Sequence, residues 1–345
     1  MLAIALPLVG VFAQSGGPAS GPAELCPQCP VSFRTPSTLA PASTETAQTL
    51  GLFNFIMVIA TVIFVLVEGL LIFAVFRYRN RRPEQALQIH GNTKLEIAWT
   101  AMPAIILAVL LGFTLRTMSD IKALPTGKVI NVTTVGHQWW WEFQYPDLKI
   151  TTANELVVPF GSAIEVAVQS EDVEHGFWTP ELFGKVDAVP GYVTRLKFTP
   201  TITGTFGGQC TQFCGTQHAQ MRFSVRVVAE GEFQAWAANE QQPAIAATGD
   251  AQAGEDYLFN NSESECKTCH TINGSATMIG IKGPDLTHLA NRSFIAGGIL
   301  ANTPENLKAW LEDPQAMKLG TLMALKKPLD EQTINNIVAY LTTLK

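Results

Sequence analysis

The sequence predicts a multidomain membrane protein with a hairpin of two transmembrane helices, an all-β domain and an all-α domain at the C-terminal end. Two long apolar runs occupy residues 52–76 and 97–115, and short runs of alternating β-forming residues follow within 128–228. Helical patterns occupy 254–345. With 345 residues, of which 47% are hydrophobic and 15% charged, the chain is long and apolar enough for several units.

The first segment, 1–13, is a short apolar run that resembles the sequence left of a signal-peptidase cut. Export is therefore expected. The run has no basic residues before it, so it is either cleaved near Ala13 or retained as an apolar leader. The next segment, 14–48, is expected on the outer side and contains Cys26 and Cys29, which either form a local disulfide or have no function.

The transmembrane hairpin is expected over 49–118. Its first apolar run has 25 residues, which as a helix span about 37 Å, more than the hydrocarbon core of a bilayer. Basic residues at 77–82 separate the two runs, and the positive-inside rule places this loop in the cytoplasm and both ends of the hairpin outside. Glu68 lies within the first run and is expected to pack against another subunit, because a carboxylate facing lipid is costly.

The β domain is expected over 125–230, where runs such as VINVTTV, AIEVAVQS and VTRLKFTP alternate and are separated by Gly and Pro. This spacing is typical of a sandwich or barrel. The polar, Ala-rich stretch in 231–253 is predicted to be an interdomain linker. The C-terminal domain, 254–345, ends in the amphipathic pattern EQTINNIVAYLTTL, which predicts a closing helix.

Inside the β domain, the motif CTQFCGTQHAQM places Cys210, Cys214, His218 and Met221 within twelve residues, and His175 lies upstream. Two thiolates, two imidazoles and a thioether are ligands that suit copper. A single zinc ion on the two cysteines and two histidines is the alternative. The thioether of Met221 favours copper, because methionine is not a usual zinc ligand.

The C-terminal domain contains the motif ECKTCH. Cys266 and Cys269 have the spacing for two thioether bonds to haem vinyl groups, and His270 follows directly as a proximal iron ligand. The alternative is a thioredoxin-like redox pair, which the following histidine and the absence of a βαβ pattern disfavour.

The copper motif, the upstream histidine and the segment GHQWWWEFQY together resemble subunit II of cytochrome c oxidase, over about residues 50–228. The segments ECKTCH and GPDLTHLANR resemble class-I cytochromes c. The whole arrangement resembles the oxidase subunits II that carry a fused cytochrome c. This resemblance implies a cupredoxin barrel with a binuclear copper A site, followed by an all-α cytochrome c domain with covalently bound haem c.

In the resembled copper A site, the thiolates of Cys210 and Cys214 bridge two coppers, His175 and His218 each bind one copper, and Met221 is a weak axial ligand.

The resemblance also assigns a backbone carbonyl ligand to Gln212. Most family members have a glutamate there that helps to hold a magnesium ion at the boundary with the catalytic subunit. The neutral Gln212 leaves magnesium uncertain, with Asp187 as a neighbouring candidate.

Two further residues match family positions outside the ligand set. Trp139 matches an exposed tryptophan through which family members accept electrons from a docked cytochrome, while Trp140 and Trp141 are expected in the core. Glu96, in LEIAW, matches a glutamate at the mouth of a proton channel shared with the catalytic subunit. The alternative for Glu96 is a solvated carboxylate at the membrane surface.

For the haem, the resemblance predicts that the carbonyl of Pro284 accepts the imidazole N–H of His270. The sixth iron ligand is expected to be Met323, because the segment KLGTLMA keeps the Lys, Gly and Met spacing of a family segment Lys-Pro-Gly-x-x-Met-Pro, although both prolines are missing. Met317 is the alternative. Met278 is excluded because it lies too few residues after the histidine to reach the far face of a haem.

The resulting prediction is that electrons pass from an external donor to haem c, then to copper A, and then to the catalytic subunit I, which reduces O2 to water. The donor is a soluble cytochrome, a cupredoxin or an upstream complex, and further partners are the other oxidase subunits and membrane lipid. Nucleic acid is excluded as a partner by a net charge of −6. The expected location is the plasma membrane of a prokaryote, with both cofactor domains on the external, periplasmic side.

Three other protein classes share parts of this pattern. Quinol oxidase subunit II keeps the hairpin and barrel but lacks the copper ligands, and nitrous oxide reductase has the copper motif without the hairpin. A free-standing membrane-anchored electron carrier or copper-delivery protein would also have the copper motif and the haem motif, and the sequence leaves this alternative open.

Overall fold

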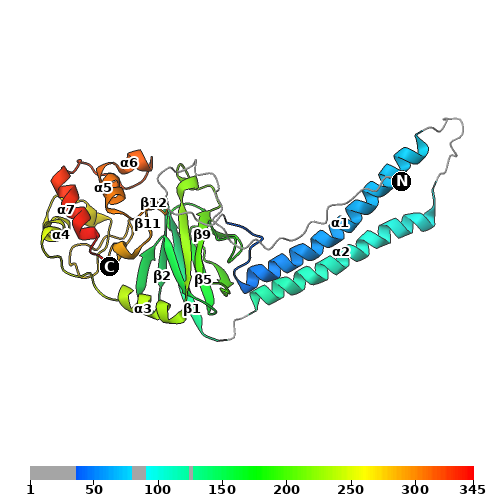
Figure 1. The fold of residues 1–345 in the computed structure, drawn as a ribbon, viewed down its shortest axis with the longest axis horizontal. Coiled ribbons are helices and arrows are strands. Elements are labelled where there is room, and N and C mark those ends of the chain that lie inside the picture. Colours follow the sequence, from blue (N-terminus) through cyan, green and yellow to red (C-terminus); the bar gives the residue numbers. More distant parts are fainter. Residues whose placement is uncertain (1–35, 80–90, 124–126) are drawn as a thin grey trace, which may run out of the picture.

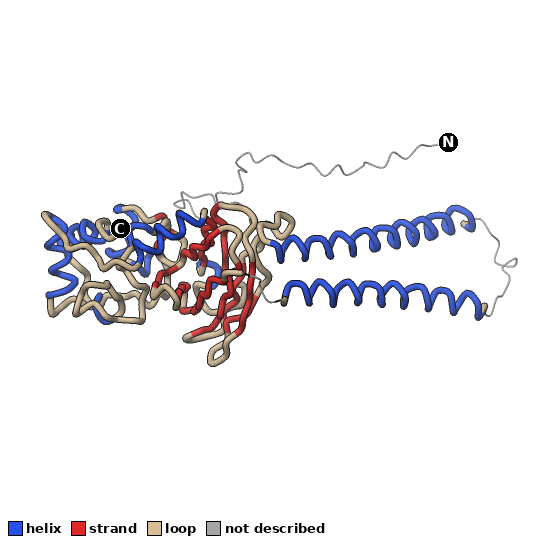
Figure 2. Tube along the Cα trace, turned by 90° about the horizontal axis from the view of Figure 1, so that it is seen from below, coloured by secondary structure: helices blue, strands red, loops and turns tan. Residues whose placement is uncertain are grey.

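The computed structural model describes residues 36–79, 91–123 and 127–345. The predicted leader, the cysteines at 26 and 29 and most of the basic loop lie outside the described residues. Figures 1 and 2 show three regions in a row: a pair of long helices, a β domain in the middle, and a mainly helical domain at the end opposite the helix pair. The predicted fold class is confirmed.

The helix pair consists of α1 (Thr44–Tyr78) and α2 (Thr93–Lys122). The side chains of Ser43 and Asn92 cap them by accepting backbone N–H groups of the first turns. The most apolar windows have mean hydropathies of 2.8 and 2.0, and neither window is buried in the protein. Long helices with uncovered apolar surfaces on all sides are suited to a bilayer, where every backbone polar group must be satisfied within the helix.

The start of α1 is fixed to the β domain by hydrogen bonds. Ser43 Oγ donates to the carbonyl of Leu182 (2.7 Å), and the backbone N–H of Thr199 donates to the Glu45 carboxylate (2.8 Å). The helix pair therefore holds the β domain directly rather than through a free linker.

Ten strands form two facing five-stranded sheets, with orders β3-β2-β1-β5-β8 and β4-β10-β9-β6-β7. Alternating buried positions along β1 and β5 follow the period-2 pattern that the sequence predicts. The strands are β1 (Val129–His137), β2 (Trp140–Tyr145), β3 (Ile150–Ala153), β4 (Glu155–Pro159), β5 (Ala163–Ser170), β6 (His175–Trp178), β7 (Val186–Ala188), β8 (Thr194–Phe198), β9 (Gly204–Cys210) and β10 (Arg222–Val228).

Aromatic side chains fill the space between the two sheets. The ring of Phe177 lies 5.1 Å from that of Trp141 and 4.5 Å from that of Phe223, centroid to centroid, and all three residues are buried. Burying a side chain of this kind contributes about 1.5–3 kcal/mol. The packed rings belong to β2, β6 and β10, so they fix the strand ends from which the copper motif extends.

The predicted linker is helical in its first half, which differs from the expectation for 231–253. Helix α3 (Glu230–Glu240) buries Phe233 and Ala237, and Trp236 packs on the ring of Tyr145 at 5.2 Å. Apolar residues at positions i, i+3 and i+4 give the helix a face that packs on the β domain.

The C-terminal domain is mainly helical and also contains a two-stranded hairpin, β11 with β12, that the sequence did not predict. Helices α4 and α7 pack closely where Gly254 faces Asn336: a Cβ at position 254 would lie 2.0 Å from the Asn336 carbonyl oxygen. The elements are α4 (Asp250–Asn260), η4 (Cys266–Thr268), η5 (Leu289–Asn291), β11 (Phe294–Ile295), β12 (Leu300–Ala301), α5 (Pro304–Glu312), α6 (Pro314–Met317) and α7 (Glu331–Leu341).

Candidate functional site

The copper motif folds back on itself between two paired strands. Strand β9 ends at Cys210 and β10 begins directly after Met221, and the backbone N–H of Cys210 donates to the Met221 carbonyl (3.0 Å). The residues between them form a loop that ends in the short helix η3 (His218–Gln220). His175 joins the group because it starts β6, which pairs with β9.

The sulfur and nitrogen atoms of this group converge on one point. The Sγ atoms of Cys210 and Cys214 are 3.7 Å apart, and Cys214 Sγ lies 3.7 Å from His218 Nδ1 and 3.8 Å from Met221 Sδ. A disulfide would need an S–S distance of about 2.05 Å. Two thiolates at this separation can instead share metal ions, because thiolate–metal bonds of this type are about 2.3 Å long.

His175 has a buried atom that fits a metal ligand. Its ring is 0% exposed, and Nδ1 has no hydrogen-bond partner among the described residues. The other nitrogen, Nε2, lies 2.7 Å from the carboxylate of Asp172, which also accepts the backbone N–H of Gln138 at 2.6 Å. Asp172 was not predicted from the sequence. The one indication there is that an acidic residue stands three positions before the histidine. Such an outer partner fixes the ring so that the free nitrogen faces the metal.

Gly136 makes room for this ring. A Cβ at position 136 would lie 2.8 Å from Cδ2 of His175, closer than real side chains approach. The glycine in GHQWWW therefore allows strand β1 to run directly beside the imidazole of His175.

The thiol environment favours ionisation of one cysteine. A hydrogen bond with the Cys214 thiol, the nearby imidazole of His175 and the backbone N–H of Gly176 lower the pKa of Cys210 despite its burial. The carbonyl oxygen of Gln212 lies 3.2 Å from Cys210 Sγ, while the Gln212 side chain is exposed. The backbone of Gln212 is thus available to the metal site, and its side chain is not needed there.

Trp139 is 8% exposed and therefore buried, which corrects the expectation of an exposed tryptophan. Trp139 packs in the core of the β domain, and Lys318 of the C-terminal domain donates to its carbonyl oxygen (2.8 Å). The indole Nε1 donates to the carbonyl oxygen of Cys214 (3.0 Å), so Trp139 touches the copper loop directly. Trp140 and Trp141 are also buried, as expected.

In the C-terminal domain, Cys266 and Cys269 lie on and just after η4 as free thiols. Nδ1 of His270 lies 2.8 Å from the carbonyl oxygen of Pro284, and burial lowers the pKa of His270. A neutral ring that donates Nδ1–H to a carbonyl keeps the lone pair of Nε2 free for iron. These residues fit a covalently bound haem.

Among the three candidate methionines, Met323 has a contact that orients its sulfur. The indole Nε1 of Trp310 donates to Met323 Sδ at 3.0 Å. Met278 is 0% exposed and packs in the hydrophobic core of the domain, while Met317 ends α6. Trp310 was not singled out in the sequence because its spacing from Met323 has no local pattern.

Of the remaining predicted positions, Glu96 and Glu68 lie on the long helices, away from both ligand groups, while Asp187 lies on the strand paired with the one that starts at His175. Glu96 is exposed in the first turn of α2 and accepts the backbone N–H of Asn92 (3.3 Å), and Glu68 is exposed on α1. Asp187 is exposed on β7, paired with Gly176. The channel role of Glu96 and the magnesium role of Asp187 stay predictions.

Three family comparisons together cover most of the chain. Residues 36–116 match the family "Cytochrome C oxidase subunit II, transmembrane domain", and residues 148–228 match "Cytochrome C oxidase subunit II, periplasmic domain". Residues 251–345 match the family "Cytochrome c".

The chain is also similar to two whole proteins over most of their length. The chain is 32% identical to cytochrome c oxidase subunit 2 of Alkalihalophilus pseudofirmus over 305 residues, which cover 84% of this chain and 86% of that protein. It is 35% identical to cytochrome c oxidase subunit 2 of Bacillus sp. PS3 over 290 residues, covering 78% of this chain and 80% of that protein. A solved periplasmic domain of cytochrome oxidase subunit II from Bradyrhizobium japonicum is 33% identical, with a TM-score of 0.33, over 34% of this chain and 97% of that one.

Proposed function

Since the chain belongs to the cytochrome c oxidase subunit II family and carries a C-terminal cytochrome c domain, we propose that electrons enter at its own haem domain and leave through copper A. The chain is a subunit of a haem–copper oxidase, and its families bind copper A and haem c.

One observation carries the proposal. In the segment before Met323, Lys318 Nζ donates to the carbonyl of Trp139 (2.8 Å), and the indole of Trp139 donates to the carbonyl of Cys214 (3.0 Å). Bonded and packed atoms therefore lead without interruption from the haem-ligand segment to a copper ligand. When bound, haem c and copper A each take up and release one electron at a time.

The ligand assignment follows from the contacts described above. Copper A would be held by the atoms that converge in the β domain, and haem c by two thioether bonds and two axial ligands in the C-terminal domain. The copper ligands are His175, Cys210, the Gln212 carbonyl, Cys214, His218 and Met221; the haem residues are Cys266, Cys269, His270 and Met323, with Pro284 behind the histidine. Magnesium stays open, because Gln212 offers no carboxylate.

Oxygen reduction is assigned to the catalytic subunit I. Within the part of the chain that the structure describes, the one group of three or more His, Cys, Asp or Glu side chains spaced for a metal is His175 with Cys210 and Cys214. The uncovered apolar surfaces of α1 and α2, with Glu68 and Glu96, are the surfaces that would contact that subunit and lipid.

The proposed orientation places the copper and haem domains on the periplasmic side of a prokaryotic plasma membrane. Arg77 and Arg79 end α1 at the tip of the hairpin that lies farthest from the β domain, and basic residues favour the cytoplasm. The donor, whether a soluble cytochrome, a cupredoxin or an upstream complex, would then approach the haem domain from outside.

Purification from native membranes tests the proposal against the free-standing electron carrier or copper-delivery protein. The chain should elute with a large multi-span subunit that carries haem, and should itself contain two coppers and one covalent haem. If the chain elutes without such a subunit while both cofactors are in place, the free-standing carrier is favoured.

A further inference from the structure

Lys318 is a buried lysine at the boundary between the two cofactor domains. Its side chain is 2% exposed. The Nζ atom donates to three carbonyl oxygens, those of Trp139 (2.8 Å), Ala296 (2.9 Å) and Gln220 (3.1 Å). An ammonium group has three protons to donate, so these three acceptors satisfy it completely.

The three carbonyls come from segments that are far apart in the sequence. Trp139 lies in the turn between β1 and β2, Gln220 directly precedes the copper ligand Met221, and Ala296 lies in the turn between β11 and β12. A charged group removed from water is costly unless it is paired. The Lys318 ammonium group has its three acceptors only where all three segments meet. The position of Lys318 therefore depends on the docked arrangement of the two domains.

The two residues after Lys318 continue the contact with the copper loop. Gln217 Nε2 donates to the carbonyl of Leu319 (2.6 Å), and a Cβ placed on Gly320 would lie 3.9 Å from Cη2 of Trp139. Three successive residues of the haem-ligand segment, 318–320, thus lie against side chains or backbone that flank the copper ligands.

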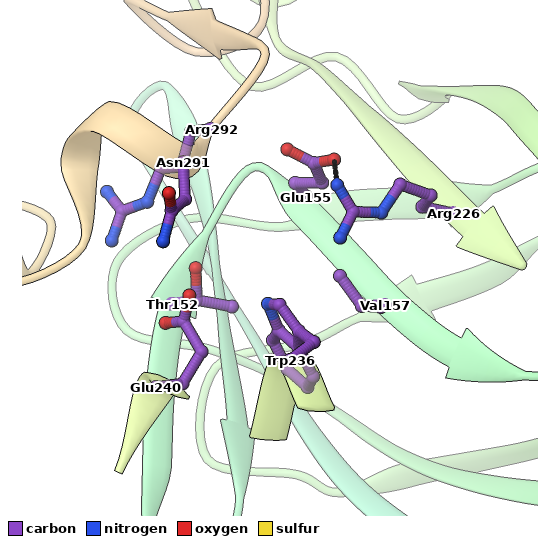
Figure 3. Close-up of a pocket in the computed structure, with 8 residues that line it drawn as sticks. All are labelled: Thr152, Glu155, Val157, Arg226, Trp236, Glu240, Asn291 and Arg292. Atoms are coloured by element: carbon purple, nitrogen blue, oxygen red, sulfur yellow. Dashed lines mark hydrogen bonds and ion pairs between the residues drawn. The ribbon is translucent and has the colours of Figure 1, made fainter. Parts of the chain in front are cut away.

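A second set of contacts, away from Lys318, also joins the domains. Ser293 N–H of the haem domain donates to the Glu155 carboxylate (3.1 Å), which also pairs with Arg226 (3.3 Å). Figure 3 shows these β-domain residues across a small cavity from Arg292 and Glu240. The haem domain therefore keeps other attachments when Lys318 is changed.

We propose that Lys318 is a positioning residue for electron transfer within the chain: its ammonium group holds segment 318–323 against Trp139 and so sets how fast an electron passes from haem c to copper A. This inference rests on the proposed function. In each transfer the ferrous haem iron loses one electron and the copper pair gains it, and no proton or further reactant is required.

The test uses the intact oxidase complex with Lys318→Met, which keeps an unbranched apolar side chain but removes the charge and the three donors. Haem c is reduced by a light pulse, and the reduction of the copper pair is followed by its absorbance. We expect transfer to slow by about tenfold or more and to become sensitive to solvent viscosity, because the haem-ligand segment must find its place before each transfer. The matched control is Lys327→Met, since Lys327 is an exposed lysine of the same loop.

Two spectra separate positioning from damage. The mixed-valence band of the copper pair and the Met–Fe(III) band of the haem should be unchanged in Lys318→Met. Lys318→Arg keeps a cation with several donors and should recover part of the transfer rate. If the Met variant does not assemble, the transfer rate of the Arg variant is measured in its place.

An unchanged transfer rate in Lys318→Met would overturn the assignment, as would a slower rate accompanied by loss of either spectrum, since Lys318 would then maintain a cofactor site. If the unaltered protein transfers no electron from haem to copper, the proposed function itself fails, and this outcome is distinct from both.

Discussion

Replacing Cys214 by serine is expected to abolish electron flow beyond the haem domain. Its sulfur lies within 3.8 Å of three other candidate ligand atoms, on Cys210, His218 and Met221, and a hydroxyl oxygen cannot bridge two coppers as a soft thiolate does. In the purified complex, the mixed-valence copper spectrum should disappear and O2 consumption should fall to the level of copper-depleted oxidase. The haem domain should still be reduced by the external donor.

Gln212→Ala is the matched control. It changes a neighbouring residue of the same loop whose side chain is exposed, and it keeps the backbone carbonyl, so the copper spectrum should survive. A purple two-copper spectrum that persists in Cys214→Ser would show that Cys214 is not a bridging ligand. One copper per chain in the unaltered protein, or colourless zinc, would contradict the binuclear assignment.

The second large effect is expected for Met323→Ala. Loss of the thioether should remove the weak near-infrared band of Met–Fe(III) ligation and lower the reduction potential, because Met/His ligation raises it. The haem should stay attached through Cys266 and Cys269. Absorption spectroscopy and a redox titration of the purified complex measure both changes.

Two other variants sharpen this result. Met317→Ala should leave the band in place; if it removes the band while Met323→Ala does not, the ligand is Met317. Trp310→Phe removes the N–H donated to Met323 Sδ together with the fused five-membered ring and leaves the thioether in place. The Met–Fe(III) band should therefore remain, whereas it should be lost in Met323→Ala.

The parts of the site that are local in sequence could be predicted from the sequence. Four of the side-chain copper ligands lie within twelve residues, and the haem motif lies within five, so their spacing alone indicates the chemistry. The three-part fold was also predictable, because apolar runs, alternating runs and amphipathic helical patterns each depend on residues near one another in the chain.

The contacts between domains could not be predicted in this way. Lys318 reaches the carbonyl of Trp139 across 179 positions in the sequence, and nothing near either residue encodes that contact. Trp139 was expected to be exposed because it matches an exposed tryptophan of the family. In the structure its ring belongs to the core of the β domain and donates to the Cys214 carbonyl, and Lys318 of the haem domain donates to its own carbonyl. The helix α3 was missed because its apolar face spans few residues within a polar stretch.

The central claim is that electrons pass in order through haem c, copper A and the catalytic subunit. The most direct test is to reduce the intact complex with a single light-triggered electron and to record the three centres together over time. The account predicts that haem c is reduced first, that the copper pair is reduced as haem c is reoxidised, and that haem of the catalytic subunit follows. Reduction of the catalytic subunit without transient reduction of the copper pair, or of the copper pair without prior reduction of haem c, would contradict it.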